Sequence, residues 1–131
     1  MDFVMKENGE IAGDFPCGTL SISTEEERGL KPLQLFVSSI AGCSGTILAA
    51  LLNKKRIPVE HLRLSAKAER ERGGKAIKAL KLVAVLDTTA AHSPEQLTKI
   101  CELVLKNCGM IQTILPRVDV KFSIECKGVS K

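Results

Sequence analysis

The chain has 131 residues, of which 44% are apolar, so it is long enough for one domain, 1–131, with a real core and too apolar for disorder. It has no Trp or Tyr and only four Phe, which disfavours base stacking on single-stranded nucleic acid and recognition in aromatic cages. The net charge of +4 is spread over short segments, which predicts solvated faces rather than a patch for nucleic acid or anionic lipid.

The cysteines and the N-terminus indicate a cytoplasmic protein. The first ten residues, MDFVMKENGE, lack a basic region followed by an apolar stretch, so a secretory signal is not expected. The five cysteines are an odd number without the spacing of a small disulfide framework, which favours free thiols in a reducing compartment. No Cys or His pair has zinc-finger spacing, so a structural metal site is not expected.

Three short strands are predicted in the first part of the chain. Asn8-Gly9 is a strong signal for a two-residue hairpin turn, because both residues tolerate positive φ. The segment GTLSIS alternates apolar and polar residues and predicts a third strand. A polar loop, TEEERGLK, follows.

Pro32 opens a run without charges that ends at Asn53, and the run predicts a long helix. A membrane span is disfavoured because the first half of the run contains Gln, Ser and Thr, so a helix buried in a soluble protein is expected. Small residues recur every fourth position, which predicts close packing on a second helix, for which a dimer axis is one possibility. They are Ser38, Ala41, Gly42, Gly45, Thr46 and Ala49.

The rest of the chain predicts a long hairpin, a helix and a final strand. In residues 61–89, apolar and polar residues alternate on both sides of a Gly73-Gly74 turn, which predicts two paired strands. Ser93 is the expected N-cap of the next helix, with Pro94 first and Gln96 completing a capping box, and Gly109 is the expected C-terminal cap. The segment RVDVKFSIEC then closes the fold as a strand. The order β-β-β-α-β-β-α-β predicts an α+β fold with a mainly antiparallel sheet.

The five cysteines differ in context. Cys126 is expected in the core of the last strand, Cys101 as core filler in the second helix, and Cys17 as an incidental loop residue. Cys43 has small neighbours that leave room for a substrate, and Cys108 sits at a helix end beside Gly109. The two could form a thiol–disulfide couple, although helical spacing does not choose Cys108 over Cys101.

Two segments resemble the OsmC/Ohr family, the osmotically inducible and organic hydroperoxide resistance proteins. KPLQLFVSSIAGCSGTILAALLNKKRIPVEHLRL is similar to the family's proline-initiated helix with small residues before the first cysteine, and to the Pro-Val link that follows it. EQLTKICELVLKNCGMIQTIL is similar to the helix that ends in the second cysteine. The order of elements agrees from about residue 3 to 126, most closely with the shorter OsmC-like proteins.

The resemblance implies an intertwined homodimer in which antiparallel sheets wrap around central helices, with the active site at the interface. It implies reduction of organic hydroperoxides with Cys43 as the peroxidatic and Cys108 as the resolving cysteine, an external dithiol as reductant, and no bound cofactor. An apolar pocket would favour alkyl hydroperoxides over hydrogen peroxide. Peroxidase members also carry a glutamate where this chain has Leu33 and an arginine in the N-terminal strands, where this chain has none, since Arg28 lies in the following loop.

Two other functions stay open at this point. Leu33 makes the expected pocket more apolar, which favours a non-peroxidatic relative that binds a small apolar ligand or exchanges thiols at the dimer interface. A third reading is an interaction domain in which both cysteines belong to the core. A depressed Cys43 pKa would favour catalysis, and a value near or above the free value of about 8.5 would favour ligand binding.

Overall fold

The computed structural model describes residues 1–89 and 92–128, which contain six strands and three α-helices. Their order matches the predicted order, with one additional short helix near the C-terminal end. The chain divides into two compact units, one comprising Met1–Ser38 and the other beginning at Ser39, and each is described by itself. That the whole chain forms one domain therefore stays a prediction.

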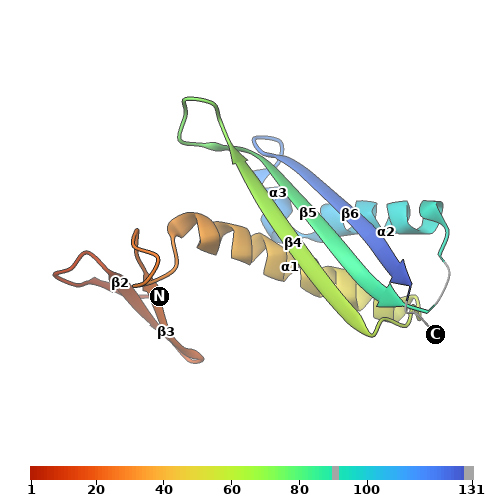
Figure 1. Cartoon of the computed structure of the whole chain (residues 1–131), viewed down its shortest axis with the longest axis horizontal. Coiled ribbons are helices and arrows are strands. Elements are labelled where there is room, and N and C mark those ends of the chain that lie inside the picture. Colours follow the sequence, from red (N-terminus) through yellow and green to blue (C-terminus); the bar gives the residue numbers. More distant parts are fainter. Residues whose placement is uncertain (90–91, 129–131) are drawn as a thin grey trace. The chain divides into compact units, whose positions relative to one another are not determined.

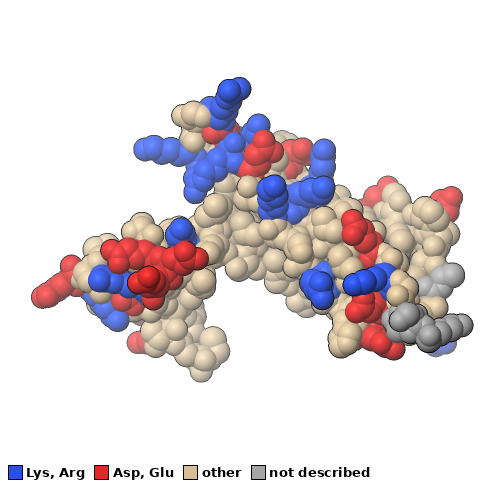
Figure 2. All heavy atoms as spheres, in the orientation of Figure 1, with Lys and Arg blue, Asp and Glu red and all other residues tan. Residues whose placement is uncertain are grey.

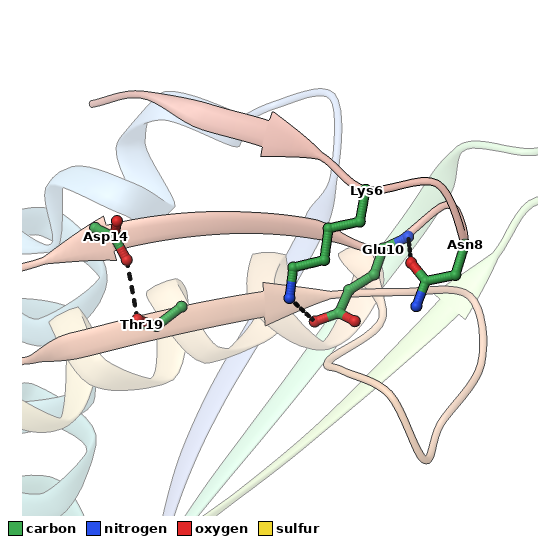
Figure 3. Close-up of polar contacts among 5 residues, drawn as sticks. All are labelled: Lys6, Asn8, Glu10, Asp14 and Thr19. Atoms are coloured by element: carbon green, nitrogen blue, oxygen red, sulfur yellow. Dashed lines mark hydrogen bonds and ion pairs between the residues drawn. The ribbon is translucent and has the colours of Figure 1, made fainter.

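The first unit contains an antiparallel sheet of β1 (Phe3–Met5), β2 (Ile11–Phe15) and β3 (Gly18–Ile22), in that order. The predicted turn joins β1 and β2, and Gly9 has a φ of 87° there. Asn8 Oδ1 accepts a 3.0 Å hydrogen bond from the Glu10 amide, and Lys6 Nζ lies 3.5 Å from Glu10 Oε1 (Figure 3). These contacts pin the turn, and Thr19 donates to Asp14 between β2 and β3.

A small aromatic contact organises this sheet. The rings of Phe3 and Phe15 meet edge to face with centroids 6.2 Å apart. Gly13 lies under Phe3, where a Cβ would come within 2.7 Å of the ring, so the close approach requires glycine. In the loop after β3, Arg28 Nε lies 3.0 Å from Glu25 Oε2.

Helix α1 (Pro32–Lys54) begins at the predicted proline. Its buried positions recur every fourth residue and all belong to the second unit: Ile40, Ser44, Leu48 and Leu52. A Cβ on Gly45 would lie 3.4 Å from Leu64 Cδ2, so the helix backbone approaches the neighbouring strand closely at this glycine. The chain leaves the helix through Arg56, which has a φ of 55°.

The second sheet has the order β4 (His61–Arg70), β5 (Ile77–Thr88), β6 (Asp119–Gly128). The predicted hairpin joins β4 and β5 antiparallel, with Gly73 at a φ of 72° in the turn. Strand β6 runs parallel to β5, so this pair is the exception to the predicted, mainly antiparallel pairing. The reason is the connection: the chain crosses over through α2 and α3, and a long helical crossover returns a strand in the parallel sense.

The core of the second unit lies between this sheet and the helices on one of its faces (Figure 1). Four residues of β5 point into it with at most 1% exposure: Leu80, Leu82, Ala84 and Leu86. Helix α2 (Pro94–Asn107) packs against β6 and buries Ile100 and Val104 completely. The other face of the sheet carries the polar residues of the alternation.

The predicted start of α2 is confirmed, but its predicted end is wrong. Ser93 Oγ accepts a 3.2 Å hydrogen bond from the Gln96 amide, and Pro94 occupies the first turn. Gly109 is not the C-terminal cap, because Cys108 occupies that position in an extended conformation. Gly109 instead begins the six-residue helix α3 (Gly109–Ile114).

Candidate functional site

The structure brings Cys43 and Cys108 together within the second unit. Cys43 lies in the middle of α1 and is half-buried, and Cys108 lies between α2 and α3 and is fully buried. The Cys108 side chain lies close enough to the Cys43 sulfur to favour its thiolate as a hydrogen-bond donor, so the two cysteines face one another. Cysteines separated by 65 positions in the sequence therefore share one site.

The backbone of Cys108 is held on both sides. Its amide donates to the Val104 carbonyl at 2.9 Å, which ends α2, and its carbonyl accepts from the Gln112 amide at 2.9 Å, which starts α3. The Gln112 side chain also donates to the Leu105 carbonyl at 2.8 Å and ties the two helices together. The junction is thus a defined bend that presents Cys108 to α1.

Helix α3 directs its first amide groups at Cys43. The backbone N–H of Met110 donates to the Cys43 sulfur, as does that of Gly109. Amide hydrogen bonds favour a thiolate over a thiol, as at other helix N-termini that hold reactive cysteines. The Met110 amide, followed by the Cys108 thiol and the Gly109 amide, therefore lowers the pKa of Cys43 below its ordinary value, against the opposing effect of burial.

Cys108 has the opposite tendency. Burial raises the pKa of the Cys108 thiol, and a thiolate on the adjacent Cys43 raises it further. The proton therefore stays on Cys108 while Cys43 ionises. The arrangement supplies a nucleophilic sulfur with a protonated sulfur beside it, which is the chemistry required for oxidation of one cysteine followed by disulfide formation with the other.

The other cysteines do not join this pair. Cys101 is half-buried and lines a separate cavity of about 370 Å³ with residues that include His92, Leu97 and Phe122. Burial raises the pKa of Cys101, so this thiol is less reactive than a free cysteine. Cys17 is exposed in the turn between β2 and β3.

The expectation that Cys126 belongs to the core is wrong, because this residue is exposed. Its strand alternates as predicted over Val118, Val120 and Phe122, which are all buried. The inward-facing positions become less buried toward the end of β6, where Ile124 is half-buried and residues 125–128 are exposed. Alternation shows which residues of a strand point toward the core. Whether those residues are buried depends on how much of the strand the neighbouring helix covers.

The main functional groups that the sequence did not reveal are backbone amides. They belong to the break between α2 and α3, which the sequence predicted only as a helix end. The segment GMIQTI after Cys108 is the available signal, since a glycine followed by residues that form helices can start a new helix. Leu33 is half-buried and Arg28 is paired with Glu25, both in the first unit.

Within residues 1–89 and 92–128, no group of three or more His, Cys, Asp or Glu side chains is placed to hold a metal ion. The contacts around Cys43 come from a thiol and backbone amides. The neighbouring hydroxyls bond to their own helix instead: Ser44 donates to the Ile40 carbonyl and Thr46 to the Gly42 carbonyl, each at 2.7 Å.

A family model described as OsmC-like protein matches residues 24–123, which includes both cysteines of the pair. Solved structures share the fold at low identity. A hypothetical protein from Aquifex aeolicus has a TM-score of 0.82 at 22% identity, covering 98% of this chain and 96% of its own. An OsmC-like protein from Mycoplasma pneumoniae has a TM-score of 0.79 at 15% identity, covering 98% and 95%.

An organic hydroperoxide resistance protein from Legionella pneumophila has a TM-score of 0.70 at 19% identity, covering 95% of this chain and 93% of its own. The comparison with curated protein sequences finds no match. These likenesses establish the fold, and the function must be argued from the site.

Proposed function

The chain belongs to the OsmC-like family, and on that premise we propose that it reduces organic hydroperoxides with Cys43 as the peroxidatic and Cys108 as the resolving cysteine. The observation that carries the proposal is that the Cys108 side chain and the first amide groups of α3 face the Cys43 sulfur, where they lower the pKa of Cys43. A sulfur without an oxidative or nucleophilic task does not require such activation.

The reaction has three balanced steps. The Cys43 thiolate attacks the terminal oxygen of ROOH, the O–O bond breaks, and ROH leaves after taking up a proton, so that Cys43 becomes a sulfenic acid. The Cys108 thiol then attacks the sulfenic sulfur, forming the S–S bond and releasing water. An external dithiol reduces this disulfide by thiol–disulfide exchange, restoring both thiols and becoming a disulfide itself.

The protonated state of Cys108 supports this division of roles. Because burial raises its pKa, Cys108 does not compete with Cys43 for the peroxide. It remains beside the reacting sulfur as a hydrogen-bond donor and is in contact when the sulfenic acid forms. A cysteine pair that an external dithiol recycles requires a reducing compartment such as the cytoplasm, in which glutathione and thioredoxin systems keep cysteines reduced.

We further propose that the working form is a homodimer. Helix α1 is long and apolar enough, by length and composition, to cross a membrane, yet only 22% of its most apolar stretch is buried. A partner subunit that packs on the small residues of α1 would remove this surface from water. It would also enclose Cys43 in apolar surroundings, which favours alkyl hydroperoxides as substrates.

The test is consumption of cumene hydroperoxide in the presence of a dithiol. Wild type should turn over, Cys43→Ser should be inactive, and Cys108→Ser should be trapped after one oxidation. Cys17→Ser is the matched control, because that residue is exposed in a turn and should leave the rate unchanged. Equal, slow consumption by wild type and Cys43→Ser would contradict the peroxidase function and leave binding of a small apolar ligand as the alternative.

A further inference from the structure

The outer face of the second sheet carries a row of three lysines, one on each strand. Lys67 on β4 is directly opposite Lys81 on β5, and Lys81 is beside Lys121 on β6 in the parallel register. All three are exposed. They are separated in the sequence by 14 and 40 positions, so only the strand register brings them together.

The ion pairs found among the described residues do not neutralise the row. The salt bridges of the described residues involve Lys6, Arg28, Lys78 and Arg117 and none of the three lysines. Like charges on directly opposite residues destabilise a sheet, because their side chains lie about 5 Å apart at Cβ. The uncompensated row is therefore a place where an anion would be favoured.

The surface is hollowed at one end of the row. A hollow of about 420 Å³ is lined by both Lys67 and Lys81, with Ala68, Glu69 and Ala79. The carboxylate of Glu69 already pairs with Lys78 at 3.1 Å. Ala79, in the next row, has only a methyl group and leaves much of the space between the strands open. An anion could therefore enter beside the lysines instead of resting on a flat surface.

The neighbouring rows limit the size of that anion. On one side Ser65 and Ser123 flank Val83 and offer hydroxyl groups. On the other side Glu69 and Asp119 flank Ala79, and these carboxylates would repel an extended polyanion. Three strands span only about 10 Å. Figure 2 shows the same mixture, with basic side chains gathered over the end of the sheet that carries the β4–β5 turn and acidic ones among them.

We propose that this lysine row binds a short phosphate chain, such as a soluble di- or triphosphate. The short span and the flanking carboxylates favour a small anion over nucleic acid or a membrane surface, which would meet Glu69 and Asp119 as well. The ammonium groups would contact the phosphoryl oxygens, and the serine hydroxyls are placed to add hydrogen bonds. This site is separate from the cysteine pair and does not depend on the peroxidase function.

The experiment titrates inorganic tripolyphosphate, and in a second arm a nucleoside triphosphate, into the full chain at about 0.1 M salt, where weak surface attraction is largely screened. The row variant is Lys67→Gln/Lys81→Gln/Lys121→Gln. The control is Lys55→Gln/Lys99→Gln/Lys106→Gln, which removes the same charge from exposed helical and loop positions. Wild type and the control should bind saturably, and the row variant should bind at least about tenfold more weakly.

Thermal unfolding checks that the variants are folded. Tripolyphosphate should raise the melting temperature of wild type and the control but not that of the row variant, because only a ligand of the native state stabilises it. A nucleoside triphosphate that binds more tightly than tripolyphosphate would show that the base is also contacted. The proposal would be overturned if wild type showed no saturable binding of tripolyphosphate, or if both triple variants lost affinity equally.

Discussion

The groups around the Cys43 sulfur are neutral donors. Cys43 receives hydrogen bonds from the Met110 and Gly109 amides and from the Cys108 thiol. These dipoles are fixed by the start of α3 and require no long charged side chain to be ordered. The thiolate is therefore stabilised by the backbone of the same helix junction that presents the second cysteine.

The contribution of a single backbone amide to the stability of the Cys43 thiolate can be tested at Gly109. Gly109→Pro removes the N–H that donates to Cys43, and it suits the fold because proline is favoured at the first position of a helix. Cys108 is already extended, with ψ 108°, as a residue before proline prefers. The alkylation rate of Cys43 near pH 7 should fall about fivefold, the factor expected for one net hydrogen bond of about 1 kcal/mol.

Gly109→Ala is the matched control, since a Cβ there would meet nothing within 4 Å and the amide is retained. Its alkylation rate should equal that of wild type. An equal loss in the alanine and proline variants would show that the amide of residue 109 does not stabilise the thiolate.

The alkylation rates of the individual cysteines should also differ in their dependence on pH. Alkylation follows the thiolate, so a lowered pKa places half-maximal reaction at a lower pH. Cys43 should reach half its maximal rate at a lower pH than an unperturbed cysteine, whereas burial moves Cys101 to a higher pH. Peptide mapping after timed treatment with iodoacetamide measures each site. Alkylation of Cys101 before Cys43 at neutral pH would contradict the assignment of the nucleophile.

The sequence identified Cys43 and Cys108 as candidates but not what activates them. Small neighbours mark Cys43, and a helix end marks Cys108, because both features are local. The amides that contact Cys43 depend on a change of direction between α2 and α3, and nothing in the residues from Asn107 to Met110 fixes that angle. The exposure of Cys126 likewise depends on where the covering helix ends.

At the scale of elements, the position of Cys43 depends on how closely α1 approaches β4. Gly45, two residues after Cys43, is the point of close approach, because its Cβ position lies 3.4 Å from Leu64. Gly45→Val should push the helix away and reduce the free energy of unfolding by about 1–3 kcal/mol, as overpacking does. Urea unfolding at one fixed protein concentration measures the loss.

The double variant Gly45→Val/Leu64→Ala makes room for the new side chain. It should be more stable than the sum of the two single changes predicts, since the residues are in contact. Strict additivity would show that Gly45 and Leu64 do not meet, and the packing described for α1 would be incorrect.

Most elements were predictable because their signals are periodic. Alternation predicted β3, β4, β5 and β6, and Ser93-Pro94 predicted the start of α2. The parallel pairing of β6 was not predicted, because alternation defines the two faces of a strand but not its neighbour or direction. The short α3 was missed because six residues carry too little periodicity to show a helix.

At the scale of the whole molecule, α1 leaves apolar and small residues exposed, and a second copy of the chain is the proposed cover. Sedimentation should give a mass of twice 14.2 kDa. Ala49, exposed on α1, is a suitable probe. Ala49→Glu should shift the equilibrium toward the monomer, because an unpaired carboxylate would be buried, while Lys99→Glu on α2 should not. A wild-type monomer at all concentrations would contradict the dimer.

The most direct test of the redox pair is to treat the reduced protein with one equivalent of cumene hydroperoxide, block the remaining thiols, and map the peptides by mass spectrometry. The account predicts a disulfide between Cys43 and Cys108, with Cys17, Cys101 and Cys126 recovered as blocked thiols. A disulfide between Cys43 and Cys101, or recovery of all five cysteines as unreacted thiols, would contradict it.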